Sequence, residues 1–203
     1  KITTTNFEPE IIFESSGTTG QAVSRHELKS VALYRESFMR GFELFYGPVS
    51  DYCIIGLLPA YLERKGSSLV FMVDELIRRS RHPQSGFYLY AFSELHDLLA
   101  DLERRKQKTL LIGVSFALLD FAAAFPMELK WALIMETGGM KGRREELTRG
   151  HLHDILQRAF GQAAIHSEYG MTELLSQAYS KGNGIYRPVP WMKARIRKED
   201  DPL

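Results

Sequence analysis

Two short segments from opposite ends of the chain contain the side chains best suited to binding a nucleotide. Residues 15–20 read SSGTTG, and residues 169–173 read YGMTE. Glycines allow tight turns, so backbone N–H groups and neighbouring hydroxyls can converge on an anion such as phosphate. An aromatic ring, a hydroxyl and a carboxylate side by side suit a base, a phosphate and a metal ion. The two segments together indicate a nucleotide site.

The first segment follows a short apolar run, and a helix-like pattern begins near His26. A strand, a small hydroxyl-rich loop and a helix N-terminus form a common cradle for phosphate. The segment is neither a Walker A loop, because no Gly-Lys-Ser/Thr follows, nor a dinucleotide fingerprint with its three spaced glycines. Loops of this composition are also common as solvated turns, and that alternative stays open here.

The second segment offers a different set of groups. Tyr169 provides a flat ring for a base, Gly170 a tight turn, Thr172 a hydroxyl for phosphate, and Glu173 an oxygen for Mg²⁺. Alternatively, Thr172 caps a following helix and Glu173 lies in its first turn. That alternative leaves unexplained why a second glycine- and hydroxyl-containing loop is predicted at the same end of the sheet.

Apolar patterns along the chain alternate between strands and helices, which predicts an α/β fold with a mostly parallel sheet flanked by helices on both faces. Ligands of such sheets bind at the carboxyl ends of the strands, where the loops 15–20, 137–142 and 168–173 are expected. The predicted strands are 11–14, 52–58, 87–91, 109–113, 131–136, 163–166 and, near the end, 191–197. The predicted helices are 26–46, 67–79, 93–107, 116–125 and 145–160.

Composition excludes several classes of function. The formal net charge of +1 gives no field for nucleic acid or an anionic membrane, and no apolar run approaches the length of a membrane span. We therefore expect a cytoplasmic protein without a nucleic-acid or membrane partner, of unassigned oligomeric state. The single cysteine, Cys53, lies in an apolar run, which predicts a buried core residue rather than a nucleophile.

SSGTTG followed by YGMTE, in this order, resembles the adenylate-forming superfamily of acyl-CoA synthetases, firefly-type luciferases and peptide-synthetase adenylation domains. The intervening Thr137-Gly138-Gly139 resembles the glycine loop that lies along adenine in that superfamily. Three longer segments are similar to bacterial acyl-protein synthetases, which activate fatty acids for aldehyde synthesis, and to their non-luminous relatives. These are ESSGTTG with the following Ser24-Arg25-His26, LPAYLERKGSSLV at 58–70, and HSEYGMTELLSQAY at 166–179.

The resemblance covers essentially the whole chain and implies a two-step reaction. ATP and a carboxylic acid, for which a fatty acid is expected, give an acyl-adenylate and pyrophosphate. The acyl group then passes to a thiol of a protein or of coenzyme A. It also implies ATP and Mg²⁺ as cofactors. Residues 1–203 would be part of the N-terminal AMP-binding domain. The small C-terminal domain with the catalytic lysine is expected beyond them, so the chain alone is expected to be inactive.

Residue roles follow from the same resemblance. Thr172 would contact the α-phosphate and Glu173 would bind Mg²⁺, as the catalytic pair. Gly138, Gly139 and Tyr169 would frame adenine, with Gly170 forming the turn beside them. The β- and γ-phosphates would be held by Ser15, Ser16, Gly17, Thr18, Thr19 and Gly20.

Three further residues, Tyr61, Met140 and His166, are candidates for the wall of the acyl pocket, although a structural role for His166 is the alternative. Where many members have Pro-Lys-Gly after the phosphate loop, this chain has Gln21-Ala22-Val23, so Arg25 is the candidate basic substitute. Two other functions stay open. They are a non-catalytic module that binds a nucleotide or an acyl-adenylate, and a scaffold subunit of a fatty-acid-reducing complex.

Overall fold

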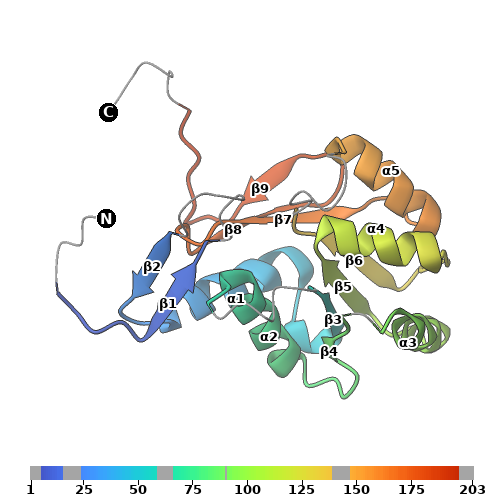
Figure 1. Cartoon of the computed structure of the whole chain (residues 1–203), viewed down its shortest axis with the longest axis horizontal. Coiled ribbons are helices and arrows are strands. Elements are labelled where there is room, and N and C mark those ends of the chain that lie inside the picture. Colours follow the sequence, from blue (N-terminus) through green and yellow to red (C-terminus); the bar gives the residue numbers. More distant parts are fainter. Residues whose placement is uncertain (1–5, 16–23, 59–65, 90, 139–146, 197–203) are drawn as a thin grey trace.

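The computed structural model of the chain describes residues 6–15, 24–58, 66–89, 91–138 and 147–196 (Figure 1). Its strands are β1 (Ile11–Glu14), β2 (Arg25–Leu28), β3 (Cys53–Leu57), β4 (Gly86–Phe87), β5 (Thr109–Gly113), β6 (Ala132–Glu136), β7 (His166–Gly170), β8 (Gln177–Ser180) and β9 (Tyr186–Pro188). Its helices are α1 (Ala32–Tyr46), the 3-10 turn η1 (Val49–Asp51), α2 (Ser68–Ser80), α3 (Phe92–Arg104), α4 (Ser115–Ala124) and α5 (Arg149–Phe160).

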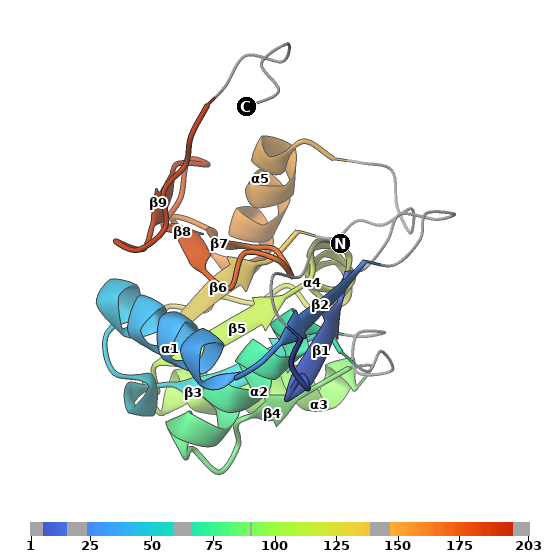
Figure 2. The same ribbon diagram turned by 90° about the vertical axis from the view of Figure 1, so that its left-hand side faces the viewer.

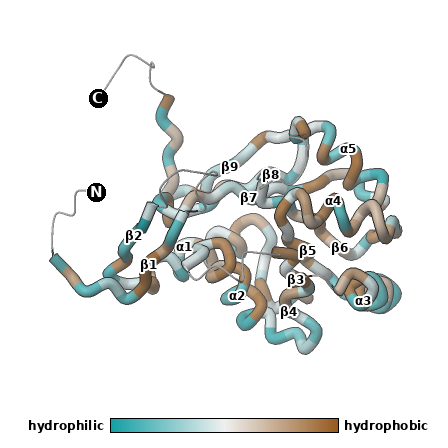
Figure 3. The backbone as a smooth tube through the Cα atoms, viewed as in Figure 1, coloured by the Kyte–Doolittle hydropathy of each residue, from teal (hydrophilic) through white to brown (hydrophobic). Residues whose placement is uncertain are grey.

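The main sheet has seven strands in the order β4-β3-β5-β6-β7-β8-β9. Strands β4, β3, β5, β6 and β7 are mutually parallel, whereas β8 and β9 continue the sheet as antiparallel strands. The predicted α/β class with a mostly parallel sheet is confirmed. The central strands β3 and β5 are buried along their whole length, as expected of parallel strands covered on both faces. Figure 3 shows the matching hydrophobic stretch at β5.

Helices cover both faces of this sheet, as the alternating pattern predicted (Figure 2). On one face, Tyr34 of α1, Phe71 of α2 and Phe13 of β1 form an edge-packed aromatic cluster. On the other face, Phe121 of α4 packs against Phe160 of α5 and against α3. Among the described residues, no helix combines the length and the apolar character needed to cross a membrane.

The segment before the first helix differs from the prediction. Strand β1 does not join the main sheet but pairs antiparallel with β2 in a separate two-stranded sheet, with Phe13 opposite His26. The predicted helix over 26–46 therefore begins only at Ala32. Residues 25–28 read Arg-His-Glu-Leu with only Leu28 buried, so they suit one edge of a hairpin. The candidate phosphate loop thus connects two antiparallel strands rather than a strand and a helix.

The end of the chain differs as well. No helix follows Thr172 and Glu173. Instead a turn, closed by the hydrogen bond from Leu174 N to Met171 O at 3.0 Å, leads into the antiparallel strand β8. Leu175 adopts a left-handed backbone with φ of 51°, which a continuing helix would not allow. The predicted strand at 191–197 is irregular over its described part, residues 191–196.

Candidate functional site

A cavity of about 300 Å³ opens at the carboxyl ends of the parallel strands, between the β1–β2 hairpin, the start of α2 and the end of β7. Four of the predicted site residues, from opposite ends of the chain, line it: Ser15, Gly170, Thr172 and Glu173. Thr137, which precedes the predicted glycine loop, lies on the same wall. The fold therefore brings the two sequence segments to one cavity at the edge of the sheet where ligands of α/β proteins bind.

The mouth and the floor of the cavity differ in exposure. Glu173 at the mouth is exposed and Thr172 is half-buried, whereas the floor residues Glu168 and Gln177 are 7% and 3% exposed. Burial, with a smaller contribution from the charge of Glu136, raises the pKa of Glu168 to about 8. The floor therefore carries a carboxyl group that is largely protonated at neutral pH.

A chain of polar contacts joins the hairpin to the second segment. The Ser24 hydroxyl lies 2.8 Å from Oγ of Ser15 and 3.2 Å from Nε2 of His26. Nε2 of His26 in turn lies 3.9 Å from a carboxylate oxygen of Glu173. The base of the candidate phosphate loop is thereby held next to the residue predicted to bind the metal ion.

The buried carboxylate of Glu136 contacts the start of the predicted glycine loop. Glu136, at the end of β6, accepts a hydrogen bond from Gly138 N at 2.7 Å through Oε2, and the Ser115 hydroxyl donates to the same oxygen at 3.4 Å. Its other oxygen lies 3.6 Å from His153 Nε2 and 3.4 Å from Arg149 Nε. Burial acts to raise the pKa of Glu136, but these neighbours outweigh it and hold the pKa below its ordinary value. Gly138 adopts a left-handed backbone with φ of 71°, so its conformation favours glycine.

We expect Glu136→Ala to lower the free energy of unfolding by about 1–3 kcal/mol, because Gly138 N and the buried His153 lose their partner. Glu136→Gln should cost less, since an amide oxygen still accepts the hydrogen bond from Gly138 N. Urea unfolding measures both. The matched control is Glu128→Ala: among the described residues its exposed carboxylate pairs with Lys130 at 3.8 Å, and its loss should change stability little. Equal losses for Glu136→Ala and Glu128→Ala would contradict the assigned role of Glu136.

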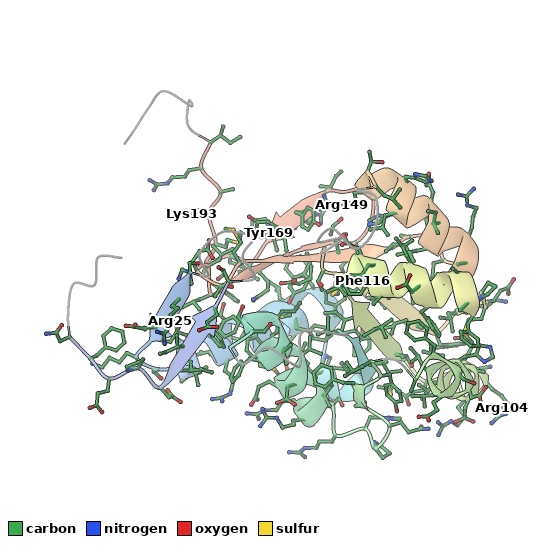
Figure 4. The ribbon with its side chains drawn as sticks, in the orientation of Figure 1. Arg25, Arg104, Phe116, Arg149, Tyr169 and Lys193 are labelled. Carbon is green, nitrogen blue, oxygen red and sulfur yellow. The ribbon has the colours of Figure 1, made fainter. Side chains whose placement is uncertain are left out.

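Three of the described residues that the sequence predicts for the site, Gly138, Tyr169 and His166, are not among the cavity residues. Tyr169 is 41% exposed and faces the opposite side of β7, where its ring packs 6.0 Å from Tyr186. Arg149 lies over the same Tyr186 ring at 5.1 Å, so an open aromatic and cationic surface forms there (Figure 4).

His166 lies at the opposite end of β7 from Gly170. Its Nδ1 is 3.3 Å from the Tyr46 hydroxyl, and burial lowers the pKa of His166 to about 4. It is not among the residues that line this cavity, so its place in the wall of an acyl pocket stays a prediction, and the structural alternative describes its contacts.

Other predicted site residues lie outside the described residues. They are Ser16, Gly17, Thr18, Thr19, Gly20, Tyr61, Gly139 and Met140.

The sequence interpretation missed the floor of the cavity. Glu168 lies two residues before Gly170 on β7, and Gln177 of β8 is directly opposite Gly170 in the strand register. Side chains two apart on a strand, and those directly opposite, share one face of a sheet. The alternation would have placed Glu168 beside Gly170, but only the unpredicted antiparallel strand β8 places Gln177 there.

The described lining of the cavity is acidic. Its described lining contains the carboxylates Glu14, Glu168 and Glu173 and no lysine, arginine or histidine. The described residues contain no cluster of three or more His, Cys, Asp or Glu side chains that could hold a metal ion. Mg²⁺ commonly binds one or two carboxylates together with substrate phosphates and water, so the exposed Glu173 suits it without such a cluster.

Comparisons with known proteins identify no family. No protein-family model matches the chain, and no curated protein matches it at a significant level.

Proposed function

We propose that the chain is the nucleotide-binding part of an ATP-dependent acid–thiol ligase that forms an acyl-adenylate. The observation that carries this proposal is the meeting of Ser15, Gly170, Thr172 and Glu173 at one cavity at the carboxyl ends of parallel strands. The spacing of the two motifs in the sequence led us to expect that meeting, and two unrelated surface turns would have no reason to share a cavity. The acid is a carboxylic acid, and fatty acids are the class that the motifs favour.

In the proposed first step, a carboxylate oxygen of the acid attacks the α-phosphorus of ATP. The bond between that phosphorus and the bridging oxygen breaks, and pyrophosphate leaves with the electron pair. A carboxylic acid is already ionised at neutral pH, so the chain needs no general base for this step. Its residues instead position the triphosphate and stabilise its negative charge. The hydroxyl of Thr172 binds the α-phosphate, and residues 15–20 hold the β- and γ-phosphates.

Negative charge at the cavity mouth makes a cation necessary for ATP to bind. Glu14 and Glu173 would repel a triphosphate, and no cationic side chain is among the described lining residues. Mg²⁺, held by Glu173, would supply charge neutralisation of the phosphates when bound. Nε2 of His26 lies 3.9 Å from a carboxylate oxygen of Glu173. Adenine would lie along Gly138 and Gly139, with Tyr169 at its edge.

In the second step, a thiol sulfur attacks the acyl carbon, a thioester forms, the thiol proton passes to solvent and AMP leaves. Cys53 is unsuited to be that thiol. It is fully buried in β3, and burial raises the pKa of Cys53 to about 11, so the reactive thiolate is disfavoured. The acceptor is therefore proposed to be coenzyme A or a thiol of another protein segment.

Carboxylate-dependent exchange of labelled pyrophosphate into ATP tests the first step. We expect exchange by the longest natural form of the chain with at least one acid from a panel of fatty, aryl and substituted acids. A complete lack of exchange across that panel would contradict the proposal.

Calorimetry with ATP and Mg²⁺ separates an enzyme from a binding module. Binding that is weakened by Glu173→Ala, without exchange for any acid, would favour a non-catalytic nucleotide-binding module. Binding together with exchange supports the ligase.

A further inference from the structure

The floor of the cavity carries polar groups that the proposed reaction does not use. Glu168 lines the cavity and is only 7% exposed, yet no described residue hydrogen-bonds to its carboxyl group. Gln177 is 3% exposed, and its Oε1 has no hydrogen-bond partner in the described structure. Buried polar groups are nearly always hydrogen-bonded, so the unpaired carboxyl group of Glu168 at the cavity floor indicates that a ligand contacts it.

The floor lies directly beneath the turn that leads to the reacting groups. A Cβ atom added to Gly170 would be 2.7 Å from Oε1 of Glu168 and 3.8 Å from Nε2 of Gln177. Gly170 is two residues before Thr172, which the proposed function places at the α-phosphate. Any acid whose carboxylate reacts there would bring the atoms next to that carboxylate over Glu168, because Gly170 has no side chain to separate them.

The polar floor contrasts with the wall around it. The Tyr34 hydroxyl donates to the backbone oxygen of Ser68 at 3.1 Å and also contacts the Gln177 side chain, and Leu69 and Met72 supply apolar surface. A purely hydrocarbon chain would pack against Leu69 and Met72 but would bury the carboxyl group of Glu168 without a partner. Leaving a buried polar group unpaired costs about 1–3 kcal/mol. A chain with a hydrogen-bond donor at this position removes that cost.

Charge indicates which polar group would fit. The described lining residues include three carboxyl groups and no cationic side chain, so the cavity favours a donor over an acceptor and tolerates a positive charge. The carboxyl group of Glu168 accepts from such a donor through its carbonyl oxygen when it is protonated and through either oxygen when it is ionised.

We infer that the acid activated at this site carries a hydrogen-bond donor, a protonated amine or a hydroxyl, within a few bonds of its carboxylate, and that Glu168 binds it. This inference rests on the proposed adenylation and narrows its substrate class. Amino acids and short hydroxy acids have this chemistry, as do fatty acids hydroxylated near the carboxylate. An unsubstituted fatty acid lacks it.

Pyrophosphate exchange with matched acids tests the inference in the longest natural form of the chain. The probes are butanoate, 3-hydroxybutanoate, 3-aminobutanoate, 2-aminobutanoate and the corresponding eight-carbon acids. We expect kcat/KM at least about tenfold higher for one donor-bearing acid than for its unsubstituted counterpart, because sites built to hydrogen-bond a group reject analogues that lack it. The hydroxy and amino arms distinguish the two kinds of donor.

Glu168→Met supplies the decisive variant, because it replaces the carboxyl with an apolar side chain of similar length. We expect it to remove the preference for the donor-bearing acid, so that kcat/KM becomes equal for the substituted and unsubstituted acids. Glu75→Gln is the matched control: its buried carboxylate on α2 faces Arg35, Arg78 and Arg79 and is not among the cavity residues, so selectivity should not change.

The outcomes separate the inference from the proposed function. Exchange with equal kcat/KM for substituted and unsubstituted acids, or a preference that survives in Glu168→Met, overturns the inference and leaves the ligase intact. If no acid supports exchange, the proposed ligase function is rejected. Binding of the same acids, measured by calorimetry, then tests the inference by itself. Binding of a donor-bearing acid that is lost in Glu168→Met then supports it, and no binding of any donor-bearing acid overturns it.

Discussion

Replacing Glu173 with alanine is expected to lower acid-dependent pyrophosphate exchange by about 100-fold or more, with little change in stability. The side chain is 52% exposed, and its ion pair with His26 is long, at 3.9 Å. Such a contact contributes little to folding. The same carboxylate opens onto the cavity beside Thr172, where it would hold the ion that neutralises the phosphates. Thr172→Ala should show the same pattern through loss of the α-phosphate contact.

The melting temperature measured beside the exchange rate distinguishes function from folding. Glu36→Ala is the matched control, since Glu36 is a 56% exposed carboxylate on α1 with one ion pair, to Arg40 at 2.8 Å. It should alter neither quantity appreciably. A loss of melting temperature in Glu173→Ala that accounts for the loss of rate, or an unchanged rate, would contradict the assigned role.

The second large effect concerns pH and the buried carboxyl of Glu168. Its pKa of about 8 in the folded chain lies above its ordinary value of 4.5, so the folded state binds a proton that the unfolded chain has released between these values. The stability that this proton provides is complete below pH 4.5 and is lost as pH rises toward 8. We expect Glu168→Gln to remove this loss, and so to be more stable than the natural chain by about 2–4 kcal/mol at pH 8.

The other titratable groups that face Glu168 do not produce this effect. Tyr34, Tyr46 and Tyr179 have pKa values raised by burial, so they stay neutral over this range. Glu136 has a lowered pKa and stays ionised. His166, with its pKa lowered to about 4, loses stability as pH falls below 6.5, which is the opposite direction.

Urea unfolding of both proteins at pH 5, 6, 7 and 8 measures the difference between them, in which the contributions of shared groups cancel. Glu75→Gln, another buried carboxyl but paired with arginines, serves as the control and should not gain stability at pH 8. A constant difference between the natural chain and Glu168→Gln across this range would show that Glu168 is ionised throughout.

Local sequence patterns were sufficient for most of the parallel core. Continuous apolar runs at 53–57 and 109–113 are buried strands, and Ser67 caps α2 by accepting a hydrogen bond from Val70 N at 3.3 Å. Gly161 ends α5 in a left-handed conformation, with φ of 63°. These features depend on residues close together in the chain, and the relevant interactions are local.

The candidate site was predictable to the extent that its residues lie after parallel strands. The motif of residues 169–173 and the rule that carboxyl ends of parallel strands meet at one edge were enough to expect Thr172 and Glu173 there, whereas Ser15 reaches the cavity from the antiparallel β1–β2 hairpin. The place of Thr172 and Glu173 in the cavity lining agrees with that expectation. The chemistry assigned to these residues stays a proposal.

Only the tertiary structure decided what lies around and beneath those motifs. The four-residue runs at 25–28 and 177–180 are too short for periodicity to separate strand from helix, and their pairing partners determine their state. The antiparallel pairing of β7 with β8 places Gln177 opposite Gly170 and beside Glu168. The sequence alone therefore determined the α/β class and the edge of the sheet at which to look. The buried polar floor depends on strand register, which no local pattern contains.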